Sequence, residues 1–173
     1  NIQQYQPAIE AFHKSLALHT NWQSYQGLGW ALFNMQQYPE AIEAFNQSVA
    51  LKEHWYSIQG LGLTLFNMQQ YPEAIEAFNQ SLALKQNWQS YQGLGWALFN
   101  TQHYPEAIEA FNQSLALKQN WQSYQGLGWG LFNMQQYQPA IEAFNQSLAL
   151  KEDWQSYKGL GLALFNIQQY QEA

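Results

Sequence analysis

The chain of 173 residues has a formal net charge of −6, and all six of its basic residues are lysines. A net negative charge and the absence of arginine, whose guanidinium group binds phosphates with two hydrogen bonds, argue against nucleic acid and against anionic membrane surfaces as partners. Cysteine is absent, which excludes disulfides and favours a cytoplasmic location, while a hydrophobic fraction of 47% lets the chain fold despite its many Gln and Asn residues.

A period of 33 residues runs through the sequence, marked by Trp22, Trp55, Trp88, Trp121 and Trp154. It defines four full copies (22–54, 55–87, 88–120, 121–153) between partial copies at 1–21 and 154–173. Regular self-similarity of this length is typical of repeat architectures. The sequence therefore predicts one repeat array over residues 1–173.

Each copy begins with a predicted helix, shown here by the copy that starts at Trp22. Large apolar residues recur at intervals of three and four, which is the spacing of one helix face, and predict a helix over residues 22–35 that ends at Gln36-Gln37. Asn21 is a good N-cap residue. The same register holds Asn87, Asn120 and Asp153, with His54 as a weaker cap.

A second predicted helix begins at Pro39, where a missing N–H costs nothing. Glu40 and Glu43 suit its positive first turn and Lys52 its negative end. Its buried stripe is predicted to hold Ala41, Ile42, Phe45, Ser48 and Val49. Because Gly27 and Gly29 each cost roughly 1 kcal/mol in a helix, a single hairpin is not expected to be stable without stacked neighbours.

These residues resemble the tetratricopeptide repeat, whose pattern is met by Tyr25, Leu28, Gly29, Leu32, Ala41 and Phe45 and by their counterparts in later copies. The resemblance implies an all-α solenoid of stacked antiparallel hairpins coiled into a right-handed superhelix. The period is one residue shorter than the family's usual one and the closing proline is missing, so we expect a different angle between repeats. Gly29 is expected to let its helix lie close to Ala41.

Neither catalysis nor a bound metal or cofactor is expected. His13, His19, His54 and His103 occupy three different kinds of position, so they form no repeated metal or catalytic cluster. The paired glutamates are explained by the dipole of the helix first turn. Asp153 is the single aspartate, which leaves little for a Ser-His-Asp arrangement.

The first helix of each copy also repeats residues on a face beside its core stripe, and the family resemblance implies that this face lines a concave groove for ligands. Such a groove is nearly uncharged, with Lys158 as its one cation, so a clamp for carboxylates is not expected. Packing between adjacent first helices is the alternative role for the tryptophans. The predicted groove residues are Gln26, Trp30, Asn34, Leu63, Asn67, Gln92, Trp96, Asn100, Gln125, Trp129, Asn133 and Leu162.

The sequence thus favours a scaffold that binds a protein or peptide partner along this groove. One alternative is head-to-tail self-association into a homo-oligomer, because residues 1–8 and 166–173 are nearly the same segment and neither end carries a polar capping helix. Another alternative is a glycan-binding surface, since Trp, Gln and Asn can stack on sugars and hydrogen-bond to them.

Overall fold

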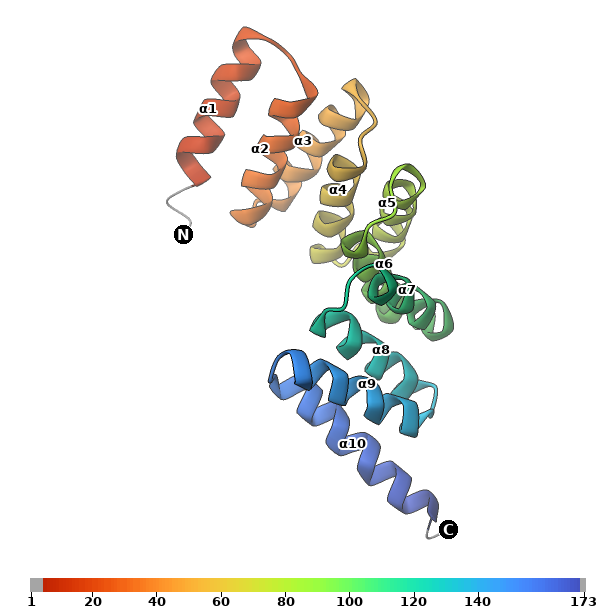
Figure 1. Ribbon diagram of the computed structural model, residues 1–173. Helices are drawn as coiled ribbons and strands as arrows, with labels where there is room; N and C mark the ends of the chain where they lie inside the picture. Colours follow the sequence, from red (N-terminus) through yellow and green to blue (C-terminus); the bar gives the residue numbers. More distant parts are fainter. Residues whose placement is uncertain (1–4, 172–173) are drawn as a thin grey trace. The chain divides into compact units, whose positions relative to one another are not determined.

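A computed structural model describes residues 5–171, with side chains through residue 168, and this part of the chain contains ten helices and no strand (Figure 1). It divides into two compact units, residues 5–86 and 87–171. Unit 1 contains α1 (Tyr5–Leu18), α2 (Trp22–Asn34), α3 (Tyr38–Leu51), α4 (Trp55–Asn67) and α5 (Tyr71–Leu84). Unit 2 contains α6 (Trp88–Asn100), α7 (Tyr104–Leu117), α8 (Trp121–Asn133), α9 (Tyr137–Leu150) and α10 (Trp154–Gln171). The predicted all-α fold is confirmed, and the expected boundaries of the helices are correct to within one or two residues.

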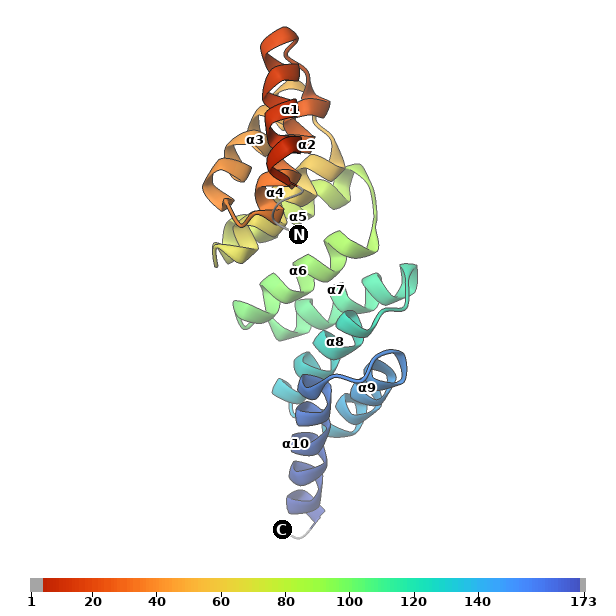
Figure 2. The same ribbon diagram turned by 90° about the vertical axis from the view of Figure 1, so that its left-hand side faces the viewer.

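Within each unit, consecutive helices form hairpins that stack side by side (Figures 1 and 2). The even-numbered helices are the first helices of the repeats and the odd-numbered helices are the second. Each first helix contacts the next first helix of its unit, as α2 does α4, α6 does α8 and α8 does α10. Second helices α3, α7 and α9 each pack against the first helices before and after them. The similar terminal segments at 1–8 and 166–173 lie partly outside the described residues.

The N-terminal caps form as the sequence predicts. The Asn21 side-chain oxygen accepts a hydrogen bond from the backbone N–H of Ser24 at 2.8 Å, and Asn87, Asn120 and Asp153 do the same in their repeats. His54 also acts as a cap, since its ring nitrogen accepts from the backbone N–H of Tyr56 at the longer distance of 3.3 Å. These caps set where each first helix begins.

The turn that ends a first helix is a Schellman motif with glutamine at the left-handed position. Gln36 has φ of 61°, its N–H donates to the carbonyl of Phe33, and the N–H of Gln37 donates to the carbonyl of Leu32. This position usually holds glycine or asparagine, because a Cβ strains the left-handed conformation. The same conformation recurs at Gln69, Gln102 and Gln135.

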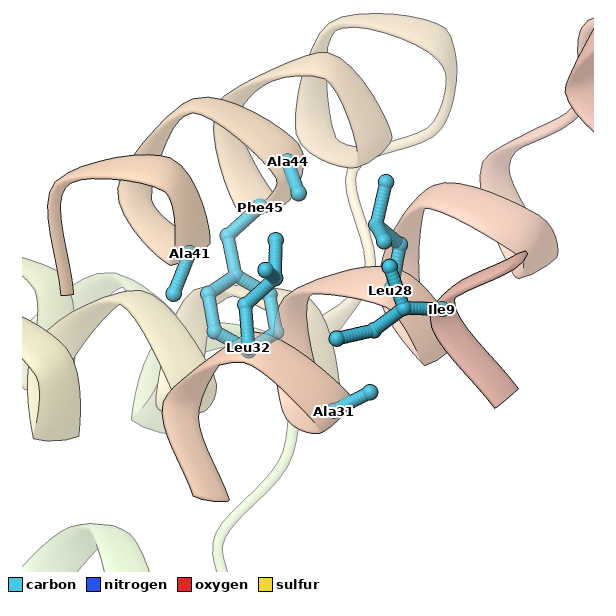
Figure 3. Close-up of a cluster of buried hydrophobic side chains, with 7 residues drawn as sticks. All are labelled: Ile9, Leu28, Ala31, Leu32, Ala41, Ala44 and Phe45. Carbon is cyan, nitrogen blue, oxygen red and sulfur yellow. The ribbon is translucent and has the colours of Figure 1, made fainter. Parts of the chain in front are cut away.

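The core depends on one phenylalanine per second helix and two glycines that face it. Phe45 has no exposed surface and belongs to a buried cluster with Leu32 and Ala41 (Figure 3). A Cβ built on Gly29 would stand 2.7 Å from its ring, and a Cβ on Gly60 of the next first helix would overlap the same ring. The space that Gly29 leaves is therefore filled by the ring of Phe45, while Ala41 lies in the same buried cluster as Leu28 and Leu32 of the Gly29 helix. Phe111 and Phe144 have the same glycine partners in unit 2.

A buried serine on α3, α7 and α9 joins successive repeats. In unit 1, Ser48 Oγ donates to the carbonyl of Trp22 at 2.9 Å and lies 2.9 Å from Ser57 Oγ on the next first helix. The same arrangement links Ser114 to Trp88 and Ser123. Of the predicted stripe of the second helix, Ala41, Phe45 and Ser48 are fully buried, whereas Ile42 and Val49 are partly exposed.

Candidate binding site on the first helices

The first helices of unit 2 form a shallow cavity of about 300 Å³. Trp96 and Phe99 come from α6, Trp129 from α8, and Trp154, Gln155 and Lys158 from α10. The cavity thus crosses three successive first helices, on the face where the sequence predicts a groove. Its walls are mostly aromatic and carry one cation.

Two of these tryptophans are anchored by the core on one edge. Trp96 makes edge-on contacts with Phe99 and with the buried Phe111, at centroid distances of 5.7 and 5.2 Å. Trp129 contacts Phe132 and Phe144 in the same way, at 5.8 and 5.3 Å. Both indoles are half-buried. Because their inner edges are held by packing, they offer a preorganised apolar surface to the cavity.

Trp154 also lines the cavity and is more exposed than Trp96 and Trp129. In four repeats the equivalent tryptophan lies under a lysine of the same repeat, at 4.1–4.7 Å from the amine to the ring centroid. Lys151 above Trp121 is one such pair. The covering lysine follows its tryptophan by 30 residues, a position that lies beyond residue 173 for Trp154, which is 70% exposed in the given chain. The spacing of apolar residues predicts this register on the core face and did not indicate that Trp154 lines the cavity.

In unit 1 the equivalent tryptophan is covered. Trp30 packs edge-on against Phe45 at 5.4 Å, and Tyr56 of α4 stacks on it at 4.9 Å with an interplanar angle of 29°. Tyr56 follows Trp30 by 26 residues, and Gln155 follows Trp129 by the same interval. A tyrosine at this position shields the indole, whereas Gln155 leaves space. The residue type at this position of the repeat, tyrosine or glutamine, was the sequence feature that could have indicated where the cavity lies.

The predicted groove glutamines are engaged between repeats. Gln26 Nε2 donates to Ser57 Oγ at 2.8 Å, and Gln92 Nε2 donates to Asn120 Oδ1 at 3.1 Å. Gln125, only 4% exposed, donates to an oxygen of Asp153 at 2.6 Å. The structure therefore places these amides beside the N-cap of the following first helix.

The predicted groove asparagines lie at the exposed ends of the first helices. Asn34, Asn67, Asn100 and Asn133 each donate from Nδ2 to the carbonyl four residues earlier, at 2.7–2.8 Å. Leu63 is half-buried in unit 1 and Leu162 is 37% exposed in unit 2. Of the predicted groove residues, Trp96 and Trp129 line the cavity.

Charge around the first helices is sparse. Lys158 is the single ionisable side chain other than tyrosine on α2, α4, α6, α8 and α10 within the residues whose side chains are described. Burial alone raises the pKa of the Asp153 carboxyl, but hydrogen bonds from Ser156, Gln155 and Gln125 outweigh it and bring that pKa below its ordinary value. Burial, followed by the charges of Lys52 and Lys85, lowers the pKa of His54.

The described residues contain neither a cluster of metal ligands nor a helix that could span a membrane. No three His, Asp or Glu side chains there stand close enough together to hold a metal ion. In the same range, no helix has the length and apolar character needed to cross a membrane.

Comparison with known proteins identifies the family. Sequence models of the tetratricopeptide repeat match residues 22–55, 56–120 and 122–153. The chain therefore belongs to the tetratricopeptide repeat family, in agreement with the resemblance found in its sequence. A search of curated protein sequences returned no match.

Several solved structures share the fold. A crystal structure of MamA aligns with a TM-score of 0.79 at 23% identity, covering 85% of this chain and 88% of that one. YrrB, described as a TPR protein with an unusual peptide-binding site, aligns with a TM-score of 0.80 at 17% identity over 92% of this chain and 85% of that one. Cut9 in its complex with Hcn1 gives 0.81 at 22% identity, over 96% of this chain and 34% of that one. Fold and family together support a scaffold for protein–protein interaction.

Proposed function

We propose that the chain binds a peptide segment of a protein partner in the aromatic cavity formed by α6, α8 and α10. The observation that carries the proposal is the grouping of Trp96, Trp129 and Trp154 around one hollow of about 300 Å³. Exposed aromatic clusters of this kind are typical of interaction hot spots. Of the wider groove predicted from the sequence, the exposed Asn100, Asn133 and Leu162 belong to the same proposal as a surrounding surface.

The chemistry of the cavity defines the kind of segment that fits. The three indoles suit a large aliphatic or aromatic side chain, which they surround with apolar surface. Lys158 at the rim favours a neutral or acidic neighbour in the peptide over a basic one, and Gln155 can hydrogen-bond to the peptide backbone. The partner segment is therefore expected to be apolar with a neutral or negative flank.

The proposal is tested by selecting ligands from a displayed peptide library with the intact chain and measuring their affinity by fluorescence anisotropy. The matched variant is Trp96→Leu with Trp129→Leu, because Leu63 and Leu162 occupy the same register in the natural chain. We expect the variant to lose at least tenfold in affinity while far-ultraviolet circular dichroism is unchanged. Unchanged affinity would exclude the cavity as the binding site.

A second variant closes the cavity instead of removing its walls. Gln155→Tyr places over Trp129 the ring that Tyr56 places over Trp30, and is expected to abolish peptide binding. Gln23→Tyr is the control, since Gln23 is an exposed residue in the same register of unit 1. Oligosaccharides are tested in parallel to separate peptide binding from glycan binding. Saturable quenching of Trp fluorescence by a sugar, without binding of the peptides, would favour the glycan alternative.

Head-to-tail self-association is a second candidate, favoured by two complementary surfaces. On α10, Tyr157 and Phe165 are 52% and 58% exposed, and nothing lies within 4 Å of a Cβ built on Gly161. On α1, Ala11 is exposed and Phe12 is half-buried, although Phe45 in the same register is fully buried. We propose that α1 of one copy packs on α10 of another, as α9 packs on α8.

Self-association of this kind is tested by sedimentation over a range of chain concentrations. Phe12 of the second copy would lie against Gly161 as Phe144 lies against Gly128. Gly161→Ala is therefore expected to weaken association without loss of helix content. Sedimentation as a monomer throughout the range would exclude the contact, and because the contact is heterologous, filaments are the alternative to a closed ring.

A further inference from the structure

A second type of hollow lies between successive second helices within each unit. In unit 1, a cavity of about 500 Å³ has Tyr25, Leu28 and Leu32 of α2 as its floor. Its walls come from α1 and α3, with Glu40 and Glu43 on the α3 side. Leu28 and Leu32 are buried, whereas both glutamates are exposed. The hollow therefore has an apolar floor and an acidic rim on its α3 side, with His13 on its α1 side.

The same hollow recurs in unit 2 at equivalent positions. A cavity of about 350 Å³ lies between α7 and α9, with Tyr124, Leu127 and Leu131 of α8 as its floor and Glu142 on its wall. Every one of these residues stands 99 residues after its counterpart in unit 1, which is three periods. Two units described separately thus form the same site. The recurrence makes it a property of the repeat.

Acidic side chains lie on the second helices and not on the described part of the first helices. The second helices carry eight of the chain's twelve acidic residues, all exposed, and a single lysine, Lys14. The first helices carry Lys158 and no acidic residue within the described side chains. The eight are Glu10, Glu40, Glu43, Glu73, Glu76, Glu106, Glu109 and Glu142. The partner that complements this side is therefore positively charged.

We infer that the second-helix side binds a basic amphipathic segment of a protein partner, at a surface distinct from the aromatic cavity of the first helices. A leucine or phenylalanine side chain of the segment enters the hollow over Leu28 in unit 1 or the equivalent hollow over Leu127 in unit 2. Lysine or arginine side chains flanking them reach Glu40, Glu43 and Glu142. One array then holds two segments of opposite character, a neutral or acidic one on its first helices and a basic one on its second helices.

The experiment measures fluorescence anisotropy with a labelled helical peptide that has leucines on one face and lysines beside them. Its counterpart, with glutamate in place of each lysine, is the control peptide. We expect the lysine peptide to bind and the glutamate peptide not to bind. Failure of the lysine peptide to bind, or equal binding of both peptides, overturns the inference.

Variants separate a specific rim from the general attraction of a negatively charged chain. Glu40→Gln with Glu43→Gln removes two charges from the rim, and Glu53→Gln with Glu152→Gln removes two charges from exposed turns outside both hollows. The rim variant is expected to bind the lysine peptide about fivefold more weakly than the turn variant, the size expected for two exposed ion pairs. Equal affinities of the two variants overturn the inference.

The aromatic cavity provides an independent control. Trp96→Leu with Trp129→Leu is expected to leave the affinity for the lysine peptide unchanged, whatever that variant does to the neutral or acidic peptides. A parallel loss of lysine-peptide binding would place the basic segment on the first helices and overturn the inference. Failure of this surface and failure of the proposed function are therefore distinguishable.

Discussion

Two glycines in the same register of unit 2 have opposite surroundings, and alanine at each should have opposite effects on stability. A Cβ on Gly128 would stand 2.7 Å from the ring of Phe144, which is fully buried. A Cβ on Gly161 would meet nothing within 4 Å. Both glycines lie in helices, so the backbone gain from alanine is the same at the two positions and the difference between the variants isolates the contact with the ring.

The magnitudes follow from two opposing terms. Replacement of glycine by alanine in a helix interior stabilises by about 1 kcal/mol. At Gly128 the added methyl group overlaps Phe144, whose ring also lies against Gly159 and therefore has little room to move. Overpacking of this kind costs typically 1–3 kcal/mol. We therefore expect Gly161→Ala to raise the free energy of unfolding by about 1 kcal/mol and Gly128→Ala to lower it by up to about 2 kcal/mol.

Urea unfolding followed by far-ultraviolet circular dichroism measures both effects. The measurement is made at high dilution, so that any association through α10 does not contribute. Because repeat arrays can unfold in steps, hydrogen exchange of α8 and α10 amides assigns each change to its own helix. If Gly128→Ala proves as stabilising as Gly161→Ala, the glycine does not serve to admit the ring, and this account of the core is wrong.

Three further predictions follow from the contacts between and within repeats. Ser114→Ala leaves the carbonyl of Trp88 without its buried donor and is expected to cost about 1–3 kcal/mol in urea unfolding, whereas serine-to-alanine changes at exposed sites should have little effect. Gln135→Gly relieves the strain of a side chain at φ of 59°, so it is expected to stabilise the chain by about 1 kcal/mol and to raise the midpoint of thermal unfolding. A lower midpoint would show that this position is not strained. Because hydrogen bonds hold the folded-state pKa of Asp153 below its ordinary value, its contribution to stability is present above the unfolded pKa and is lost as the pH falls through the folded pKa. Asp153→Asn places at this position the residue type that Asn120 supplies one repeat earlier. The variant should therefore lose less stability than the natural chain below about pH 5. Equal acid sensitivity of the variant and the natural chain would exclude this role of the Asp153 carboxylate.

The aromatic cavity shows how far the sequence could predict a site. The register of Trp96 and Trp129 was sufficient to place both indoles on one face, because helix periodicity determines which side chains share a face. It was not sufficient to distinguish Trp30, whose ring is covered by Tyr56 of the next repeat. The covering residue was visible in the sequence, but its position over the indole depends on how α4 packs against α2.

The glutamines illustrate the same limit for polar groups. From the sequence, Gln26, Gln92 and Gln125 were candidates for binding a ligand, since nothing local showed a partner for their amides. In the folded chain each amide meets the N-cap or a serine of a first helix 28 or 31 residues away. Partners at that distance along the chain are brought together by stacking, which local pattern does not describe.

The sequence by itself determined the order of the helices, their ends and the family. These features depend on interactions within a few residues, such as the cap between Asn21 and Ser24, and on a motif repeated often enough to be unambiguous. The tertiary structure alone decided that Gly29 and Gly60 both lie against one ring, that Tyr56 covers Trp30 and that hollows open between second helices. The physical reason is that each depends on the volume left between neighbouring helices, which is known only once the repeats are stacked.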